Sequence, residues 1–383
     1  MIFLGNHKNN KFVIHQKIIN ENKFIMEKNS RQSIIEKILS IKKNKCTSNN
    51  DIKRKILSNV IRKQYHDKTQ KKEMAIRFKW KIYNTIFAHL GWVRSIDFNY
   101  SNSLFFTGSS DRTIKIWNFP KGRLLSTLPG HIDQITDILV DQDQDLLYSA
   151  SLDKTIKCWD LKQNRVINQY YGHKSGVYTI NLFNPLKILF SGGRDCVIKV
   201  WDTRSNKEVN SMRGHENTIM KIISDRKNPK IISTSIDRTI KFWDLRTAKC
   251  TGSINKFNNA LRDLKLSNDG FIYGVSIDLF FKVKNSENNK IVTPLFNLKK
   301  SFFTCIDLSK KGIILTGTED GFIFVWHKFK QKLLNKLDVN MDKRTTLDEK
   351  NSIIDIKFDR TGSRFISSDT SRCIKLWHQR SPY

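Results

Sequence analysis

Three residue types that hydrolases combine into a catalytic triad recur in this 383-residue chain at constant spacing. An aspartate follows each histidine after 22 residues, a serine or threonine stands four residues before that aspartate, and a tryptophan follows it by six. The four sets are His89, Thr107, Asp111 and Trp117; His131, Ser149, Asp153 and Trp159; His173, Ser191, Asp195 and Trp201; and His215, Ser233, Asp237 and Trp243. A histidine between a hydroxyl and a carboxylate can activate the hydroxyl as a nucleophile. The residue types alone therefore allow a hydrolase.

The fourfold recurrence argues against catalysis. A triad is one constellation beside one oxyanion hole, whereas four identical copies indicate a repeated structural unit. The chain also lacks a phosphate-binding loop, a nucleophile elbow, a zinc-protease motif and the kinase signatures. Six cysteines are scattered without a Cys-x-x-Cys pair, which disfavours a zinc knuckle or a disulfide framework and fits a reducing compartment. We therefore expect a non-enzymatic protein with no catalytic residue, no metal and no cofactor.

The sets belong to short strands that repeat with a period of 42 residues. Most of these strands alternate apolar and polar residues before a tryptophan, which is the pattern of a half-buried β-strand. They cover 113–117, 155–159, 197–201, 239–243, 322–326 and 373–377, and the fifth is apolar throughout. The fourth and fifth tryptophans are 83 residues apart and the fifth and sixth 51. One repeat has therefore lost its tryptophan, the last has an insertion, and seven repeats are expected.

This organisation resembles the WD-repeat β-propeller family, in which each repeat forms a four-stranded blade. The resemblance implies an all-β, seven-bladed propeller over residues 79–383. It places the histidine before the first strand, the hydroxyl on the second, the aspartate on the following turn and the tryptophan on the third, joined as a structural hydrogen-bonded tetrad. The last blade lacks an outer strand within the sequence after Trp377, so we expect residues 81–87 to pair there and close the ring.

Blades 5 to 7 carry incomplete tetrads, and we expect weaker order in them. The positions are, in blade 5, Phe257 for the histidine, Gly274 for the hydroxyl, Asp278, and Lys284 for the tryptophan; in blade 6, Thr316, Asp320 and Trp326 without a histidine; and in blade 7, Ser367, Trp377, and Ser371 for the aspartate.

Several longer strings point to a particular group of propellers. They are His-Leu-Gly-Trp-Val-Arg-Ser at 89–95, Gly-His-Lys-Ser-Gly-Val-Tyr at 172–178, Gly-Gly-Arg-Asp at 192–195, Gly-His-Glu-Asn-Thr at 214–218 and Lys-Phe-Trp-Asp-Leu-Arg at 241–246. Over roughly residues 78–378 the chain resembles the pleiotropic-regulator family of nuclear splicing factors, whose fifth repeat also lacks its tryptophan. The resemblance implies a non-catalytic scaffold of the activated spliceosome in the nucleus. Its partners would be proteins of the complex named after the nineteenth pre-mRNA-processing factor, with small nuclear RNA and pre-mRNA nearby, and with no membrane and no small-molecule substrate.

The net charge of +32 has two interpretations. Basic chains attract nucleic acid through its phosphates. However, the chain contains 48 Lys, 46 Ile and 33 Asn but only 5 Ala, a composition that A/T-rich codons also produce. Two alternatives to the splicing scaffold therefore stay open: a direct RNA-binding propeller, and a WD-repeat adaptor of another complex, such as a ubiquitin-ligase substrate receptor or a signalling scaffold.

Residues 1–78 form a basic N-terminal extension, predicted to be partly helical or disordered. Ser33 and Glu36 match a capping box before an apolar run, and Asp51 can cap a second amphipathic helix that includes Ile56 and Val60. Such short faces cannot form a core alone, so a solvated basic tail is the alternative.

Four residues beside the tetrads are candidates for binding partners: Trp92, Arg94, Tyr178 and Arg194. Aromatic residues and arginine are common anchors of protein interfaces. The competing interpretation for each is ordinary surface or packing. Arg194 is the strongest candidate, because an arginine on a tight turn gains little from packing. Changing Arg194 and Arg94 to glutamate is expected to weaken partner binding without unfolding the ring.

Overall fold

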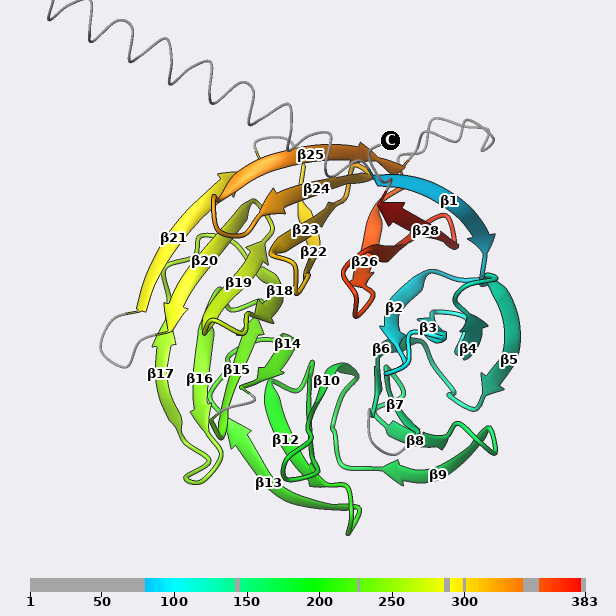
Figure 1. The fold of residues 1–383 in the computed structure, drawn as a ribbon. Coiled ribbons are helices and arrows are strands. Elements are labelled where there is room, and N and C mark those ends of the chain that lie inside the picture. The colour runs from blue at the N-terminus through cyan, green and yellow to red at the C-terminus, as the bar shows by residue number, and fades with distance from the viewer. Residues whose placement is uncertain are drawn as a thin grey trace, which may run out of the picture. The chain divides into compact units, whose positions relative to one another are not determined.

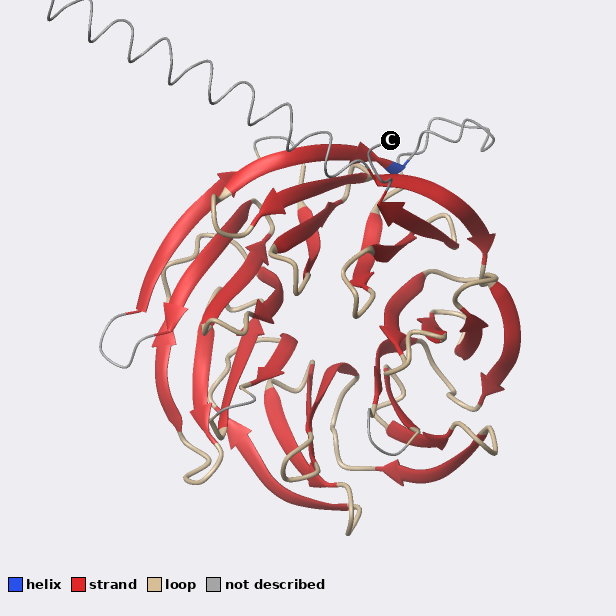
Figure 2. Ribbon diagram, in the orientation of Figure 1, coloured by secondary structure: helices blue, strands red, loops and turns tan. Residues whose placement is uncertain are grey.

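The computed structural model describes residues 80–141, 145–225, 228–285, 290–298, 301–339 and 351–379. In these residues, seven four-stranded antiparallel sheets follow one another around a ring (Figures 1 and 2). The predicted all-β, seven-bladed architecture is confirmed. The extension predicted over residues 1–78 lies outside the described residues, as do its two predicted helices.

Blades 1 to 6 each take four consecutive strands of the chain, and blade 7 completes its sheet with β1. Blade 1 contains β2 (Val93–Phe98), β3 (Leu104–Ser109), β4 (Thr113–Asn118) and β5 (Arg123–Pro129); blade 2 contains β6 (Ile135–Val140), β7 (Leu146–Ser151), β8 (Ile156–Asp160) and β9 (Arg165–Tyr170). Blade 3 contains β10 (Val177–Phe183), β11 (Ile188–Gly193), β12 (Val197–Asp202) and β13 (Lys207–Arg213); blade 4 contains β14 (Ile219–Ser224), β15 (Lys230–Ser235), β16 (Ile240–Asp244) and β17 (Cys250–Ile254). Blade 5 contains β18 (Leu261–Leu266), β19 (Phe271–Ser276), β20 (Leu279–Asn285) and β21 (Lys290–Asn297); blade 6 contains β22 (Phe303–Leu308), β23 (Ile313–Thr318), β24 (Phe322–His327) and β25 (Lys332–Asp338); blade 7 contains β26 (Ile353–Phe358), β27 (Arg364–Asp369), β28 (Cys373–Gln379) and β1 (Trp80–Phe87).

Burial changes from strand to strand within a blade. In blade 1, β3 is buried along almost its whole length, whereas β5 at the rim is largely exposed. The second strand is covered on both faces by neighbouring blades, so its sequence Leu-Phe-Phe-Thr-Gly-Ser lacks the alternation of a one-sided sheet. The third strand, β4, alternates partly exposed and buried residues.

The hydrophobic core is divided among the seams between blades. Seven clusters of buried residues occur in the described chain, and each takes its members from two neighbouring blades. The cluster between blades 1 and 2 includes Phe106, Ile135 and Trp159. A blade therefore completes its core only when its neighbours are present, as is usual for repeat architectures.

The ring closes through strands from the two ends of the propeller sequence. β1 pairs antiparallel with β28, with Thr85 opposite Lys375, and becomes the outer strand of blade 7 (blue beside red in Figure 1). Trp80 is buried, and its ring packs edge-on against Phe365 with 4.9 Å between ring centroids. The predicted closure is confirmed, and it gives the edge of β28 a partner.

The register of blade 5 corrects the residue assigned to its missing tryptophan. In blades 1 to 4 the residue paired with the tetrad hydroxyl stands two positions before the tryptophan. Gly274 pairs with Phe281, so the tryptophan position belongs to Val283, which is buried, while Lys284 is exposed. The assignment of Lys284 was wrong because the β19–β20 hairpin is one residue shorter than its counterparts.

Candidate functional site

The residues of each complete tetrad meet on one face of the ring, which we name the upper face. It carries the loops that enter the inner strands and the turns between second and third strands. In blade 1, His89 Nδ1 lies 2.7 Å from Asp111 Oδ2, and Nε2 lies 2.8 Å from Thr107 Oγ1. Trp117 Nε1 donates to the same hydroxyl oxygen at 2.9 Å. Blades 2 to 4 repeat the three contacts at 2.6–2.8 Å.

Each tetrad carboxylate also binds the backbone on both sides of the network. Asp111 Oδ2 accepts a hydrogen bond from the backbone N–H of Leu90, and Oδ1 accepts from the N–H and hydroxyl of Thr113. Burial by itself would raise the pKa of Asp111, but the hydrogen bonds from His89 and Thr113 outweigh it and hold that pKa well below its usual value. The ionised carboxylate therefore ties the entering loop to the turn.

The geometry withholds the tetrad hydroxyls from substrates. Thr107, Ser149, Ser191 and Ser233 are fully buried, and each hydroxyl oxygen already contacts a tryptophan N–H and a histidine nitrogen. A nucleophile needs an open approach for the atom it attacks. The arrangement braces two loops and leaves no room for attack at the hydroxyl.

A family model described as "WD domain, G-beta repeat" matches residues 80–118, 122–160, 164–202 and 206–244. Each matched segment ends with the third strand of a blade, at β4, β8, β12 and β16. These four segments are WD repeats, and the chain folds as a seven-bladed β-propeller. In the WD segments each repeat contributes the outer strand of one blade and three strands of the next.

Curated proteins match over a short stretch of the chain. Protein pleiotropic regulatory locus 1 of Arabidopsis thaliana is 60% identical over 45 residues, which is 12% of this chain and 9% of that protein. Pleiotropic regulator 1 of Homo sapiens is 56% identical over 45 residues, again 12% and 9%. Pre-mRNA-splicing factor PRP46 of Yarrowia lipolytica is 51% identical over 45 residues, 12% of this chain and 10% of that protein. The matched stretch thus spans about a tenth of these relatives.

A recurrent lysine extends the WD tetrads and was missed in the sequence. It stands two residues before the tryptophan, and in blades 1, 2 and 4 it donates to the carbonyl of the residue before the histidine. The bonds are Lys115 to Ala88 at 2.7 Å, Lys157 to Gly130 at 2.5 Å and Lys241 to Gly214 at 2.5 Å. The repeated Thr-Ile-Lys strands were the signal that could have revealed this role.

Neighbouring WD blades are also joined by a belt of hydrogen bonds along the inner strands. At several seams the third residue of one inner strand accepts from the fourth backbone N–H of the next. The pairs are Asp355 and Ile96 at 2.8 Å, Ser95 and Ile138 at 3.1 Å, Asp137 and Ile180 at 3.1 Å, and Asp263 and Ile306 at 3.0 Å. Lys221 lies 3.1 Å from Asp137, so the belt also carries an ion pair across the ring.

Blades 5 to 7 keep parts of the tetrad. Trp326 donates to Thr316 at 3.0 Å and Trp377 to Ser367 at 2.9 Å, so the tryptophan–hydroxyl bond survives in blades 6 and 7. In blade 5 the ring of Phe257 packs on Phe281, with centroids 4.5 Å apart. Apolar packing has replaced the polar network there.

The structure places Trp92 and Arg94 together on the upper face of blade 1. The guanidinium of Arg94 lies 5.9 Å from the Trp92 ring centroid. Arg94 also donates to Ser110 at 2.9 Å and to Gln134 of blade 2 at 2.8 Å. Burial lowers its pKa, although Tyr178 opposes that shift. Arg94 therefore bridges two blades, and we expect its replacement by glutamate to remove this link as well as a contact for a partner.

Arg194 and Tyr178 have different surroundings in blade 3. Arg194 is exposed on the turn after β11, and its guanidinium makes no hydrogen bond or ion pair with any residue that the structure describes. Tyr178 is half-buried on β10. The geometry thus leaves Arg194 available to a partner and gives Arg94 a place within the ring.

Sequence reasoning missed an apolar component of the upper face. Four exposed apolar side chains lie on this face. Leu90 and Ile132 directly follow the first two tetrad histidines. Ile236 directly precedes a tetrad aspartate, and Phe302 directly precedes β22. Together with half-exposed Trp92, these side chains give the upper face several apolar residues that a partner can contact. The position directly after each histidine was the available signal.

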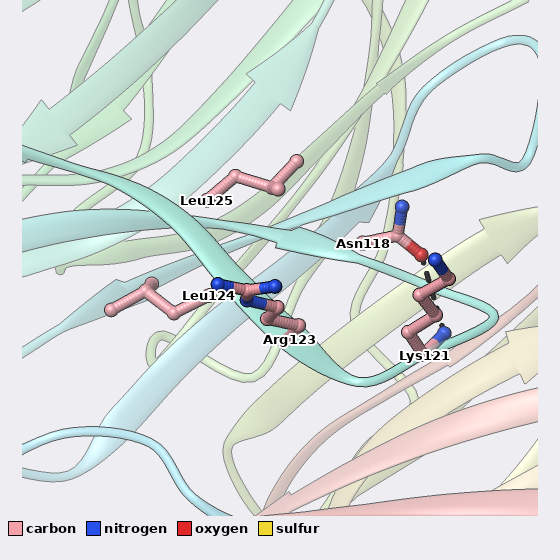
Figure 3. A pocket seen from close by; sticks show the side chains of 5 residues that line it. All are labelled: Asn118, Lys121, Arg123, Leu124 and Leu125. Atoms are coloured by element: carbon pink, nitrogen blue, oxygen red, sulfur yellow. Dashed lines mark hydrogen bonds between the residues drawn. The ribbon is translucent and has the colours of Figure 1, made fainter.

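A hollow of about 270 Å³ lies at the rim of blade 1 (Figure 3). Its lining is Asn118, Lys121, Arg123, Leu124 and Leu125, and the backbone N–H of Lys121 donates to Asn118. None of the tetrad or candidate partner residues lines it.

Within the described ranges, no helix is long and apolar enough to cross a membrane. No group of three or more His, Cys, Asp or Glu in the same ranges is arranged to hold a metal ion.

Proposed function

We propose that this WD-repeat propeller is a non-catalytic scaffold of the activated spliceosome that supports pre-mRNA splicing in the nucleus. The observation that carries the proposal is the 51–60% identity over 45 residues to proteins named as pleiotropic regulators and pre-mRNA-splicing factors. Its partners are proteins of the complex named after the nineteenth pre-mRNA-processing factor, beside small nuclear RNA and pre-mRNA. No membrane and no small-molecule substrate takes part.

The geometry supports a protein-binding role for the upper face. The polar groups of each tetrad are hydrogen-bonded to one another, so the tetrads fix the loops without reacting. The same loops present Trp92, Ile132 and Arg194, which combine apolar area with an exposed cation. Aromatic and arginine side chains are enriched among the few residues that supply most of the binding energy of protein interfaces.

Affinity purification of the tagged full chain from nuclear extract, followed by mass spectrometry, tests the proposal. The variant Arg194→Glu combined with Trp92→Ala removes two upper-face anchors, while Arg204→Glu on the opposite face of blade 3 is the control. Splicing proteins are expected with wild type and control, and at least tenfold less with the double variant, because each anchor commonly contributes more than 1 kcal/mol.

Three results would oppose the proposal. Recovery of ubiquitin-ligase or signalling components in place of splicing proteins would favour the adaptor alternative. Equal recovery with all variants would show that partners use another surface. A lowered melting temperature of the double variant would reassign Trp92 or Arg194 to the structure of the ring.

A further inference from the structure

Blade 6 carries an exposed aromatic ring among lysines on the lower face, which is the face opposite the tetrads. This face consists of the loops between first and second strands and between third and fourth strands. In blade 6 these loops are 309–312 and 328–331, with the sequences Ser-Lys-Lys-Gly and Lys-Phe-Lys-Gln. They contain four lysines and no acidic residue. The hairpins belong to the orange part of the ring in Figure 1.

The aromatic ring is Phe329, which is 71% exposed. The corresponding residues, three after the tryptophans of blades 1 to 4, are Pro120, Lys162, Arg204 and Arg246. A ring at this tip is therefore peculiar to blade 6 among these five blades. An exposed aromatic ring offers a flat apolar face on which a planar group of a partner can stack.

Local contacts hold the Phe329 ring in place. The backbone N–H groups of Phe329 and Lys330 both donate to His327 Nδ1 at 3.2 Å, which fixes the turn. Burial and the charge of Lys330 lower the pKa of His327, so the imidazole stays neutral and able to accept. The ring covers Gly312, where a Cβ atom would lie only 2.8 Å from Phe329 Cε2. The ring is thus preorganised above the neighbouring hairpin.

The lysines around the ring differ in their pairing. Lys328 forms an ion pair with Asp269 at 2.6 Å, and its ammonium lies 5.3 Å from the Phe329 centroid. Lys310, Lys311 and Lys330 are exposed and form no side-chain hydrogen bond or ion pair with residues in the described ranges. Three uncompensated cations therefore lie in the two loops that meet at the ring.

The same surface continues through blade 7 to a second aromatic residue. A Cβ at Gly362 of blade 7 would lie 3.6 Å from Lys311 Cγ, so the two loops touch. The backbone N–H of Arg360 donates to Asn102 of blade 1 at 3.2 Å, and the Arg360 guanidinium lies 4.8 Å from the Tyr100 ring. Tyr100 is 65% exposed. Aromatic rings and cations thus alternate from blade 6 to blade 1.

We propose that this lower-face surface of blades 6, 7 and 1 binds single-stranded nucleic acid. Unpaired bases stack on Phe329 and Tyr100, while Lys310, Lys311 and Lys330 contact the phosphates. The alternation matches a single strand, in which bases and phosphates alternate along the chain. In a duplex the bases stay stacked within the helix, so they cannot stack on the two rings. The surface is distinct from the upper face and stands independently of the proposed splicing role.

Binding of a fluorescein-labelled 12-nucleotide oligouridylate to the full chain, measured by fluorescence anisotropy, tests this site. Phe329→Ala is expected to weaken binding about fivefold or more, because one stacked base contributes about 1 kcal/mol at least. The triple variant Lys310→Glu, Lys311→Glu and Lys330→Glu is expected to reduce the slope of log affinity against log salt by about 2, which corresponds to three phosphate contacts on a single strand.

Matched controls separate this site from the general basicity of the chain. Ile132→Ala removes an exposed apolar side chain from the upper face, and the triple variant Lys154→Glu, Lys174→Glu and Arg238→Glu reverses three exposed charges there. Both controls are expected to retain at least half of the affinity. Equal losses in controls and test variants, or unchanged binding in the test variants, would overturn the site. A third result would also overturn the site: the wild-type chain binds a deca-glutamate peptide and no RNA, and the test variants lose the binding of that peptide. The surface would then be a protein site.

Discussion

Blade 2 and blade 5 have the same four-stranded sheet and opposite internal chemistry. In blade 2, His131, Ser149 and Trp159 form a continuous hydrogen-bonded chain that ends at an ionised aspartate. In blade 5, Phe257 packs on Phe281 where those polar contacts would be. The sheet forms in both, so the tetrad is not what creates a blade.

Two features are common to both blades. Each blade places apolar residues in the seams with its two neighbours. Each also contributes to the inner-strand belt, through Asp137 in blade 2 and Asp263 in blade 5. We infer that seams and belt specify the blade, while the tetrad fixes the position of its upper-face loop and turn.

The largest expected difference concerns the tryptophan position. Trp159→Ala removes a buried ring and one donor to Ser149, and it should destabilise the propeller by about 3–5 kcal/mol. Val283→Ala in blade 5 removes two methyl groups and should destabilise it by about 2 kcal/mol. Urea unfolding followed by tryptophan fluorescence and circular dichroism measures both. A Trp159→Ala variant as stable as Val283→Ala would contradict the role assigned to the tetrad.

Exchanging the residue at the histidine position should harm both blades. His131→Phe removes one hydrogen-bond partner each from Ser149 and Asp153. Phe257→His buries an imidazole in a blade where Gly274 at the hydroxyl position offers no hydroxyl. Each change should lower the free energy of unfolding by about 2–3 kcal/mol, because unpaired buried polar groups keep their desolvation penalty. Differential scanning calorimetry provides the comparison, with exposed Ile132→Ala as the control. Tolerance of Phe257→His would mean that the imidazole finds a polar partner in blade 5, for which Asp278 at the aspartate position is the candidate.

A hydroxyl added alone to blade 5 should also be unfavourable. A Cβ at Gly274 would lie 2.4 Å from atoms of both Leu264 and Phe281, so Gly274→Ser overpacks the seam. The expected loss is about 1–2 kcal/mol. The double variant Gly274→Ser with Phe281→Leu makes space and should recover part of the thermal stability. No recovery would indicate that the overlap with Leu264, and not the overlap with Phe281, sets the loss.

The repeat spacing predicted the ring, its seven blades and its closure because each blade is built from local hairpins of nearly constant length. The same spacing misplaced the tryptophan position of blade 5, where one hairpin is shorter by a residue and Val283 takes the place assigned to Lys284. Contacts between blades were harder to foresee. The bond from Arg94 to Gln134 depends on how two blades face each other, which composition and period do not encode.

The complete tetrads should also govern the acid stability of blades 1 to 4. Burial opposes ionisation of Asp153, but hydrogen bonds from His131 and Thr155 lower its pKa below the value in the unfolded chain. A lowered pKa stabilises the fold fully above about pH 5, and that contribution is lost as the pH falls below about 4. Between pH 7 and pH 3 the loss for one such group is about 1 kcal/mol. Asp153→Asn should therefore be less stable than wild type at pH 7, yet lose about 1 kcal/mol less on acidification, as urea unfolding at both pH values will measure.

Because Asp195 is held by His173 in the same way, Asp195→Asn should repeat the result in blade 3. An unaltered difference between the two pH values in both variants would show that acid sensitivity arises elsewhere, for instance in the carboxylates of the inner-strand belt.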